Sequence, residues 1–186
     1  VNTMGTDTIA AWGICDKLDM LIWLLADAMG PALTTYTAQN MGAGRWDRVC
    51  KGNRIGAVMS VTAVGTVSLG LYFLTAPLGV LFVPVQDAAA VVPQAVAFMR
   101  RMAPFFLFYA LAESFSGACC GTGDTVRPMI LTLLSICLLR VLGILLVLPR
   151  QHTMECIIDI YISSWIAAGI GFLILWQWEK NRVQKT

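Results

Sequence analysis

The sequence predicts an all-α integral membrane protein with about five transmembrane helices, and three observations support this. Hydrophobic residues make up 58% of the 186 residues and charged residues only 13%, whereas a soluble domain is about a quarter charged. Residues 55–83 and 160–178 contain no charged residue, and a helix needs about 20 apolar residues to cross a bilayer. Because lipid cannot pair backbone polar groups, such segments must be helical.

The spans are justified in chain order. The first, at about 8–41, combines the apolar stretch 18–41 with an extension whose Asp16, Lys17 and Asp19 suit an aqueous or cavity-lining end. The second, 55–83, is free of charge. The third, 96–120, and the fourth, 129–149, are interrupted by charged residues, and the fifth, 156–178, ends in tryptophans that are typical of a membrane interface.

The basic residues predict the orientation of the chain. Those in the segments on one side are Arg45, Arg48, Lys51, Arg54, Arg127, Lys180, Arg182 and Lys185. The opposite side holds Arg100, Arg101 and Arg150. Positively charged loops face the cytoplasm, so we expect a multi-pass protein of the cell membrane with a cytoplasmic C-terminus. Five spans then place the N-terminus outside, which indicates that the chain is part of a longer protein.

Several classes of function lack support in the sequence. The six cysteines show no spacing suited to zinc or to a disulfide framework, so we expect buried free thiols and no metal. We expect His152 to be a solvated loop residue. Patterns typical of hydrolases, metalloproteases and nucleotide-binding loops do not occur, so we expect no enzyme and no cofactor beyond a coupling ion. No basic stripe with interleaved aromatics indicates a nucleic-acid partner.

Glu113 is the main candidate for a functional site. It lies in the middle of the third span, where a charged side chain costs a few kcal/mol and therefore indicates function by default. Tyr109 precedes it by one helical turn, and Ser116 and Gly117 follow on the same face. With Gly121, Gly117 also forms a pattern that permits close helix packing. Glu113 is either a cation or proton site or a structural carboxylate bonded to a neighbouring helix.

Asp27 and Arg140 are the other charged candidates within spans. Gly30 and Pro31 follow Asp27, and a proline there removes a backbone hydrogen bond beside the carboxylate. Broken helices beside acids occur in ion-coupled transporters, although shielding by neighbouring side chains or helices is an equal alternative. Arg140 lies about 18 Å from the start of its span. It either forms an ion pair that stabilises the fold or contacts substrate.

Two helix ends share a pattern of small residues and glycine turns. The first contains Gln39, Gly42, Ala43 and Gly44; the second contains Gly121, Gly123, Asp124, Thr125 and Pro128. In this order, the two sets resemble the signatures of the MATE family, multidrug and toxic compound extrusion. The resemblance extends over nearly the whole chain. It departs from the family pattern at Cys120, where an arginine is common, and at Glu113, one turn from the acid position expected near Tyr109.

The resemblance implies a fold of twelve helices in two six-helix lobes. Residues 1–186 then correspond to the last five helices of the C-terminal lobe, and the N-terminal lobe is a partner. It also implies antiport, in which a sodium or proton gradient drives export of cationic or amphipathic compounds through a cavity between the lobes, by alternating access. Glu113, Asp27, Tyr109 and Arg140 are the expected cation or substrate path, and the glycine-turn residues are structural. The alternatives are a lipid-linked sugar flippase of the same superfamily and an oligomerising small membrane protein.

Overall fold

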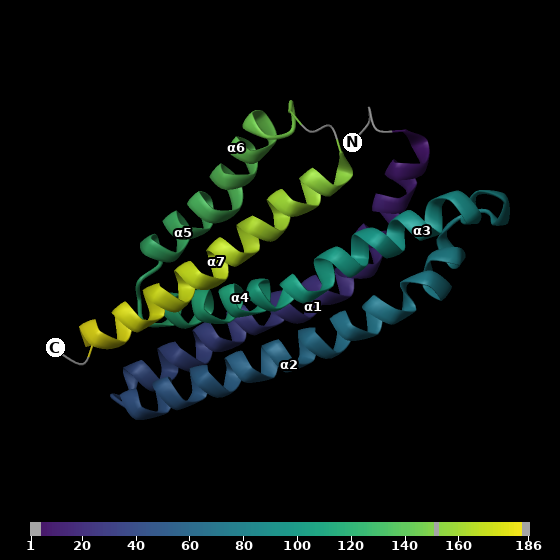
Figure 1. Ribbon diagram of the computed structural model, residues 1–186. Helices are drawn as coiled ribbons and strands as arrows, with labels where there is room; N and C mark the ends of the chain where they lie inside the picture. Colours follow the sequence, from purple (N-terminus) through teal and green to yellow (C-terminus); the bar gives the residue numbers. More distant parts are fainter. Residues whose placement is uncertain (1–4, 151–152, 184–186) are drawn as a thin grey trace.

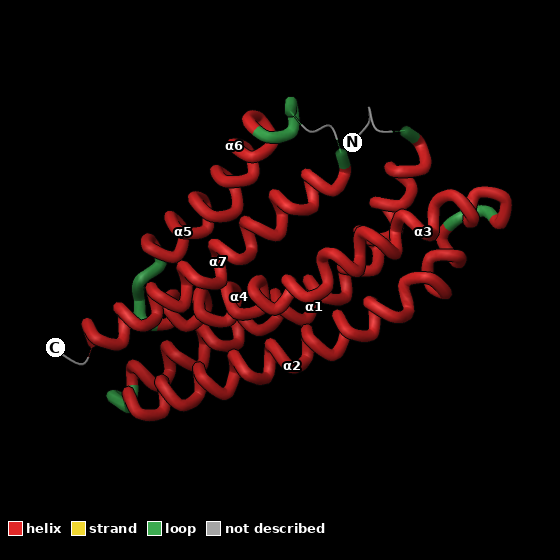
Figure 2. Tube along the Cα trace, viewed as in Figure 1, coloured by secondary structure: helices red, strands yellow, loops and turns green. Residues whose placement is uncertain are grey.

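The computed structural model describes residues 5–150 and 153–183, and within these ranges the chain is helical without any strand. His152 and Lys185, which figured in the sequence interpretation, lie outside the described residues. Figure 1 shows long helices side by side, with the α1–α2 turn, the α4–α5 turn and the C-terminus at the same end of the bundle. Figure 2 shows that the loops joining the helices are short. The predicted all-α class is confirmed.

Seven helices and three short irregular turns form five rods. The helices are α1 (Thr6–Gly42), α2 (Trp46–Gly79), α3 (Val85–Met102), α4 (Phe106–Gly121), α5 (Val126–Thr132), α6 (Leu139–Leu146) and α7 (Met154–Val183). The 3₁₀ turns η1 (Val80–Phe82) and η2 (Ala103–Phe105) extend α2 and join α3 to α4, and the π-helical turn η3 (Leu133–Leu138) joins α5 to α6. Each expected span overlaps one rod, although 55–83 runs one residue past η1 and 129–149 runs three residues past α6.

Four of the rods are long and apolar enough to cross a membrane. They begin at Trp46, Val85, Val126 and Met154. The rod formed by α1 is also long, at 37 residues, but polar side chains are spread along both of its halves. Other helices cover part of this polar surface, since Asp19 and Thr37 are both buried. Five spans therefore remain our prediction for the chain.

Helix α4 forms the centre of the bundle. It packs against α1, α2 and α7, while α5, η3 and α6 lie to one side and contact chiefly α7 (Figure 1). Trp165, Phe106 and Phe172 are among the largest fully buried side chains. The rod α3–α4 changes geometry at η2, where Pro104 lacks the N–H that would continue the helix.

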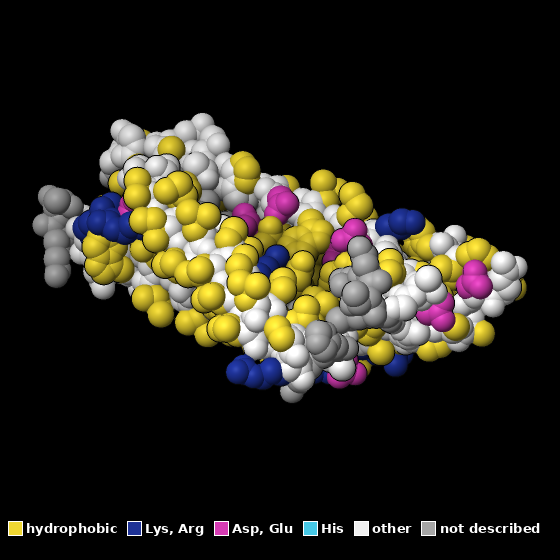
Figure 3. Space-filling view, turned by 90° about the horizontal axis from the view of Figure 1, so that it is seen from above, with side chains coloured by type: hydrophobic (Ala, Val, Ile, Leu, Met, Phe, Trp, Pro, Cys, Tyr) yellow, Lys and Arg dark blue, Asp and Glu magenta, His cyan; other side chains and the backbone are white. Residues whose placement is uncertain are grey.

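Charged groups mark the two ends of the membrane-spanning part. Arg101 on α3 binds Asp159 on α7 through two hydrogen bonds of 2.8 and 2.7 Å, and its Nη1 lies 3.2 Å from Glu155 Oε2. From Arg101 to Gly121, and from Asp159 to Glu179, each helix rises about 30 Å, which matches the hydrocarbon thickness. Figure 3 shows hydrophobic side chains spread along much of one face of the molecule.

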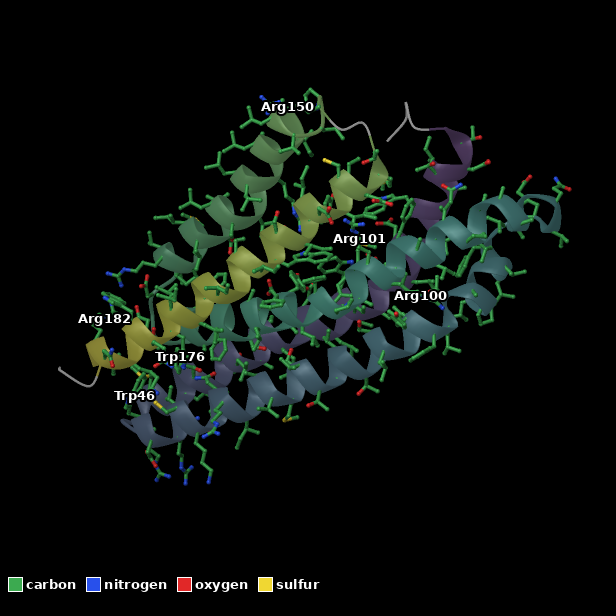
Figure 4. The ribbon with its side chains drawn as sticks, in the orientation of Figure 1. Trp46, Arg100, Arg101, Arg150, Trp176 and Arg182 are labelled. Atoms are coloured by element: carbon green, nitrogen blue, oxygen red, sulfur yellow. The ribbon has the colours of Figure 1, made fainter. Side chains whose placement is uncertain are left out.

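We call the end with the α1–α2 turn, the α4–α5 turn and the end of α7 the basic end. Its cationic residues are Arg45, Arg48, Lys51, Arg54, Arg127, Lys180 and Arg182. Arg182 lies there in Figure 4, away from Arg100, Arg101 and Arg150. The segregation of positive charge inferred from the sequence is therefore reproduced in the three-dimensional arrangement.

Candidate cation and substrate site

Three of the four predicted path residues come together midway along the bundle. The Tyr109 hydroxyl on α4 donates a hydrogen bond of 2.6 Å to Asp27 Oδ1 on α1. Glu113 lies one turn further along α4, and its Oε2 is 3.4 Å from the place where a Cβ on Gly30 would lie. Glu113 and the Asp27 partner Tyr109 therefore lie on the side of α4 that faces α1. Acids on two helices thus share one region midway along the bundle.

Glycines allow α1 and α4 to approach closely enough to form this site. A Cβ on Gly117 would clash with the backbone oxygen of Gly30, and a Cβ on Gly121 would lie 2.7 Å from Thr34 O. The Thr34 hydroxyl lies 3.0 Å from Gly30 O on its own helix and 3.0 Å from Gly117 O on α4, so it can donate a hydrogen bond to either carbonyl. The expected packing role of the Gly117 and Gly121 pair is confirmed.

Pro31 adds a backbone acceptor beside the acids. Helix α1 continues through Pro31, but a proline has no N–H to donate to the carbonyl four residues earlier. That carbonyl belongs to Asp27. Since Asp27 is exposed and Glu113 half-buried, the region presents two carboxylates, a phenol and a carbonyl that lacks a donor at position 31 to the space beside α1 and α4.

Arg140 has different partners from those expected. Its Nε donates a hydrogen bond of 2.9 Å to Ser164 Oγ on α7, and its guanidinium lies 4.1 Å from the centre of the Tyr161 ring. Within residues 5–150 and 153–183, it forms no ion pair with an acid. The expected stabilising ion pair is therefore absent from this part of the chain, and a hydroxyl and an aromatic ring hold the cation instead.

The π-helical turn η3 precedes Arg140 and was not foreseen from the sequence. Hydrogen bonds in such a turn join residues five apart, and π-helical turns occur frequently at functional sites. Leu133–Leu138 consists of ordinary apolar residues and one serine, so no proline or glycine marks the change in geometry. The turn alters the direction in which the following residues, including Arg140, point from the helix.

A second acid on α1 was assigned to the wrong environment. Asp16 and Lys17 are exposed, as expected for a polar end, but Asp19 is only 6% exposed. Its Oδ1 has no hydrogen-bond partner among the described residues. Trp23 lies one turn further along α1, and its ring packs edge-on against Tyr109 with the ring centres 4.5 Å apart. Asp19, Trp23 and Asp27 therefore follow one face of α1 at intervals of four residues.

The residues of the two sequence signatures form matching turns at the basic end. After α1, the Ala43 N–H bonds Gln39 O at 3.2 Å and Gly44 has a φ of 67°. After α4, the Thr122 N–H bonds Cys119 O at 3.1 Å and Gly123 has a φ of 94°. A positive φ is readily adopted only by glycine. Gly42 has open space around it, so packing does not require its small size.

The second turn is tied to α7 by charge. Asp124 accepts hydrogen bonds from the Arg127 backbone N–H at 3.3 Å and from its guanidinium at 2.6 Å. The same guanidinium reaches buried Glu179 at 3.3 Å, and Arg182 binds the other oxygen of Glu179 at 2.8 Å. Thr125 occupies the N-cap position of α5 without a side-chain capping bond, and Pro128 lies in the first turn.

Burial raises the pKa of the Asp124 carboxyl, but the hydrogen bonds that it receives lower the pKa more. The net pKa lies below the ordinary value, chiefly because of the Arg127 backbone N–H and side chain. Asp124 is therefore ionised at neutral pH. No group of three His, Cys, Asp or Glu side chains that could hold a metal ion is found in the described part of the chain.

The fold and the mid-membrane acids define a multi-pass helical membrane protein with a polar site between its helices. A sequence description of the MatE family matches residues 1–146, which is more than half of the chain. The chain therefore belongs to the MatE family, and the resemblance noted in its turns is confirmed.

Two relatives carry names that describe drug resistance. The probable multidrug resistance protein YoeA of Bacillus subtilis is 20% identical over 190 residues, which cover 100% of this chain and 40% of that protein. The probable multidrug resistance protein NorM of Thermotoga maritima is 25% identical over 186 residues, which cover 96% of this chain and 39% of that protein. The chain thus spans about two-fifths of the length of these relatives.

Proposed function

We propose that the chain is the C-terminal lobe of an ion-coupled multidrug exporter, a transporter and not an enzyme. In this proposal, a sodium or proton gradient drives export of cationic or amphipathic compounds. Five helices span the cell membrane, the C-terminus is cytoplasmic, and an N-terminal lobe completes the cavity. Membership of the MatE family and the names of the two relatives support this class of function.

The observation that carries the proposal is the bond between Tyr109 and Asp27 beside Glu113. Two carboxylates close together cannot both remain ionised at low cost, so one proton or one cation stabilises the pair. A bound organic cation competes for the same negative charge, and this competition couples export to ion entry. Arg140, held on the side of α7, contributes a positive charge that limits how many cations the region binds.

Export of a cationic dye from vesicles containing the full-length protein tests this assignment. We expect Glu113→Gln and Asp27→Asn each to reduce gradient-driven export at least ten-fold, while Asp87→Asn, an exposed acid at the start of α3, exports normally. Separate sodium and proton gradients identify the coupling ion. Export that is unchanged in both path variants overturns the role of the acids.

The same assay separates the alternative functions. A lipid-linked sugar flippase would leave the dye in place under every gradient but move a fluorescent lipid-linked sugar between leaflets. An oligomerising small membrane protein would pass ions without any gradient-dependent export. Either outcome overturns the exporter proposal, and neither is expected.

A further inference from the structure

A groove near the basic end lies outside the site described above. Its volume is about 460 Å³, and it runs between α2, α4 and α7. The residues that matter for its chemistry are Arg54, Val58, Phe115, Trp176, Gln177 and Lys180. Glu113, Asp27, Tyr109 and Arg140 do not line it, so a ligand in this groove would not contact the proposed cation and substrate site.

The body of the groove is apolar and matches one membrane leaflet in length. Along α2, lining residues extend from Cys50 to Thr62, a rise of about 18 Å. Half of a hydrocarbon core about 30 Å thick is about 15 Å. Phe115 on α4 and Trp176 on α7 both line the groove, and their ring centres lie 6.2 Å apart. A single acyl chain from one leaflet fits this length and chemistry.

The mouth of the groove is cationic. Arg54 and Lys180 enter it from α2 and α7, and neither forms an ion pair with a residue in the described ranges. Figure 4 shows Trp46 and Trp176 at this end of the bundle, where their ring centres are 6.1 Å apart. Tryptophans are typical of the interface between lipid and water. The positive charges therefore lie at headgroup level.

We propose that this groove binds an anionic phospholipid. Its phosphate is held by Arg54 and Lys180, its acyl chain lies against Phe115 and Trp176, and Gln177 supplies a neutral hydrogen-bonding group. Basic pockets between transmembrane helices bind anionic headgroups, and the bilayer supplies this ligand at high concentration. A cationic compound would meet two like charges at the mouth, so an exported drug does not fit.

The proposal is tested with full-length protein purified in detergent, by measuring retained phosphatidylglycerol and phosphatidylcholine with native mass spectrometry. We expect tighter binding of phosphatidylglycerol, and about a ten-fold loss of that binding in the double variant Arg54→Gln with Lys180→Gln. Arg48→Gln with Lys51→Gln is the matched control, because it removes the same charge at the same end from residues that do not line the groove. The control should change binding less than two-fold.

A second pair of variants tests the groove itself without changing charge. Val58→Trp places a bulky ring in the groove from an exposed position, while Met59→Trp places it on an equally exposed neighbour that does not line it. We expect only Val58→Trp to displace phosphatidylglycerol. Equal losses in both charge variants would show surface attraction alone. That result overturns the proposal. So does unchanged phosphatidylglycerol binding in Val58→Trp. The absence of any retained lipid, because another segment fills the groove, overturns it as well.

Discussion

At the scale of single residues, the hydroxyl of Tyr109 decides how the acids of α1 and α4 are joined. It bridges α1 and α4, and a hydrogen bond to a charged group contributes about 1.5–3 kcal/mol. Without the hydroxyl, the Asp27 carboxylate would no longer be held in place against α4. The bridge therefore fixes the position of the Asp27 carboxylate relative to Glu113.

Tyr109→Phe should lower the apparent affinity of the transporter for its exported cation by about ten-fold or more, because the ring remains but the bond to Asp27 is lost. Dye export measured over a range of dye concentrations checks this. Tyr36→Phe is the matched control, since among the described residues that hydroxyl bonds the backbone oxygen of Arg48 at the basic end. An equal affinity in Tyr109→Phe and native protein would contradict the bridge.

Gly117→Ala should destabilise the protein by about 1–3 kcal/mol, because its new methyl group meets backbone that cannot rotate away. Thermal unfolding in detergent measures the loss. Gly70→Ala provides the comparison, since nothing lies within 4 Å of its added Cβ and alanine favours a helix by up to about 1 kcal/mol. If the two variants unfold alike, α1 and α4 do not approach as described.

At the scale of elements, the turn between α4 and α5 is fastened to the end of α7. Asp124, Arg127, Glu179 and Arg182 form a continuous chain of ion pairs, and the Arg127 guanidinium lies 4.1 Å from the centre of the Trp178 ring. Gly123 permits the turn, and Arg127 links it to Glu179 on α7. The α4–α5 turn and the end of α7 are therefore held together at the basic end.

Asp124→Asn should weaken this fastening by about 1 kcal/mol or less, because Arg127 is partly exposed. The pKa of Asp124 is lowered in the folded protein, so its contribution is complete above the ordinary value of about 3.9 and is lost as pH falls through the lowered folded value. Thermal unfolding of native and variant protein should differ by a constant amount from pH 5 to 8. The difference should shrink below about pH 4, whereas a difference that shrinks between pH 8 and 6 would contradict this assignment.

At the scale of the whole molecule, the fold class followed from the composition because apolar runs in lipid can only be helical. The close approach at Gly117 was also foreseeable, since small residues at four-residue spacing have one common use. The partners of Arg140 could not be predicted from the sequence, because Ser164 and Tyr161 lie on another helix and carry no charge. The burial of Asp19 could not be predicted either, because nearby Asp16, Lys17 and Met20 are exposed and two of them are charged.

The orientation of the molecule is open to a direct check. Because positively charged ends are retained on the inner side of the membrane, we expect a protease to reach a C-terminal tag only from the cytoplasm. We expect a cysteine introduced by Asp87→Cys in α3 to react with an impermeant reagent only from outside. Arg150→Cys, in the loop before α7, should react from the same side as Asp87→Cys. The reverse pattern would overturn the proposed topology.

The unequal packing of the rods divides the lobe into two mechanical parts. Helices α1, α2, α4 and α7 hold each other on several sides, whereas α5, η3 and α6 rest mainly on α7. The π-helical turn gives this outer arm a joint halfway along its length, and the ion pairs at Asp124 anchor its lower end. In the exporter proposed above, the upper half of this arm swings when the cavity changes the side on which it opens, while the frame of α1 and α4, held on several sides, keeps its shape. Arg140, just beyond the joint, is bound to Ser164 and Tyr161 on α7, so its positive charge shifts relative to Asp27 and Glu113 only when that movement breaks these contacts.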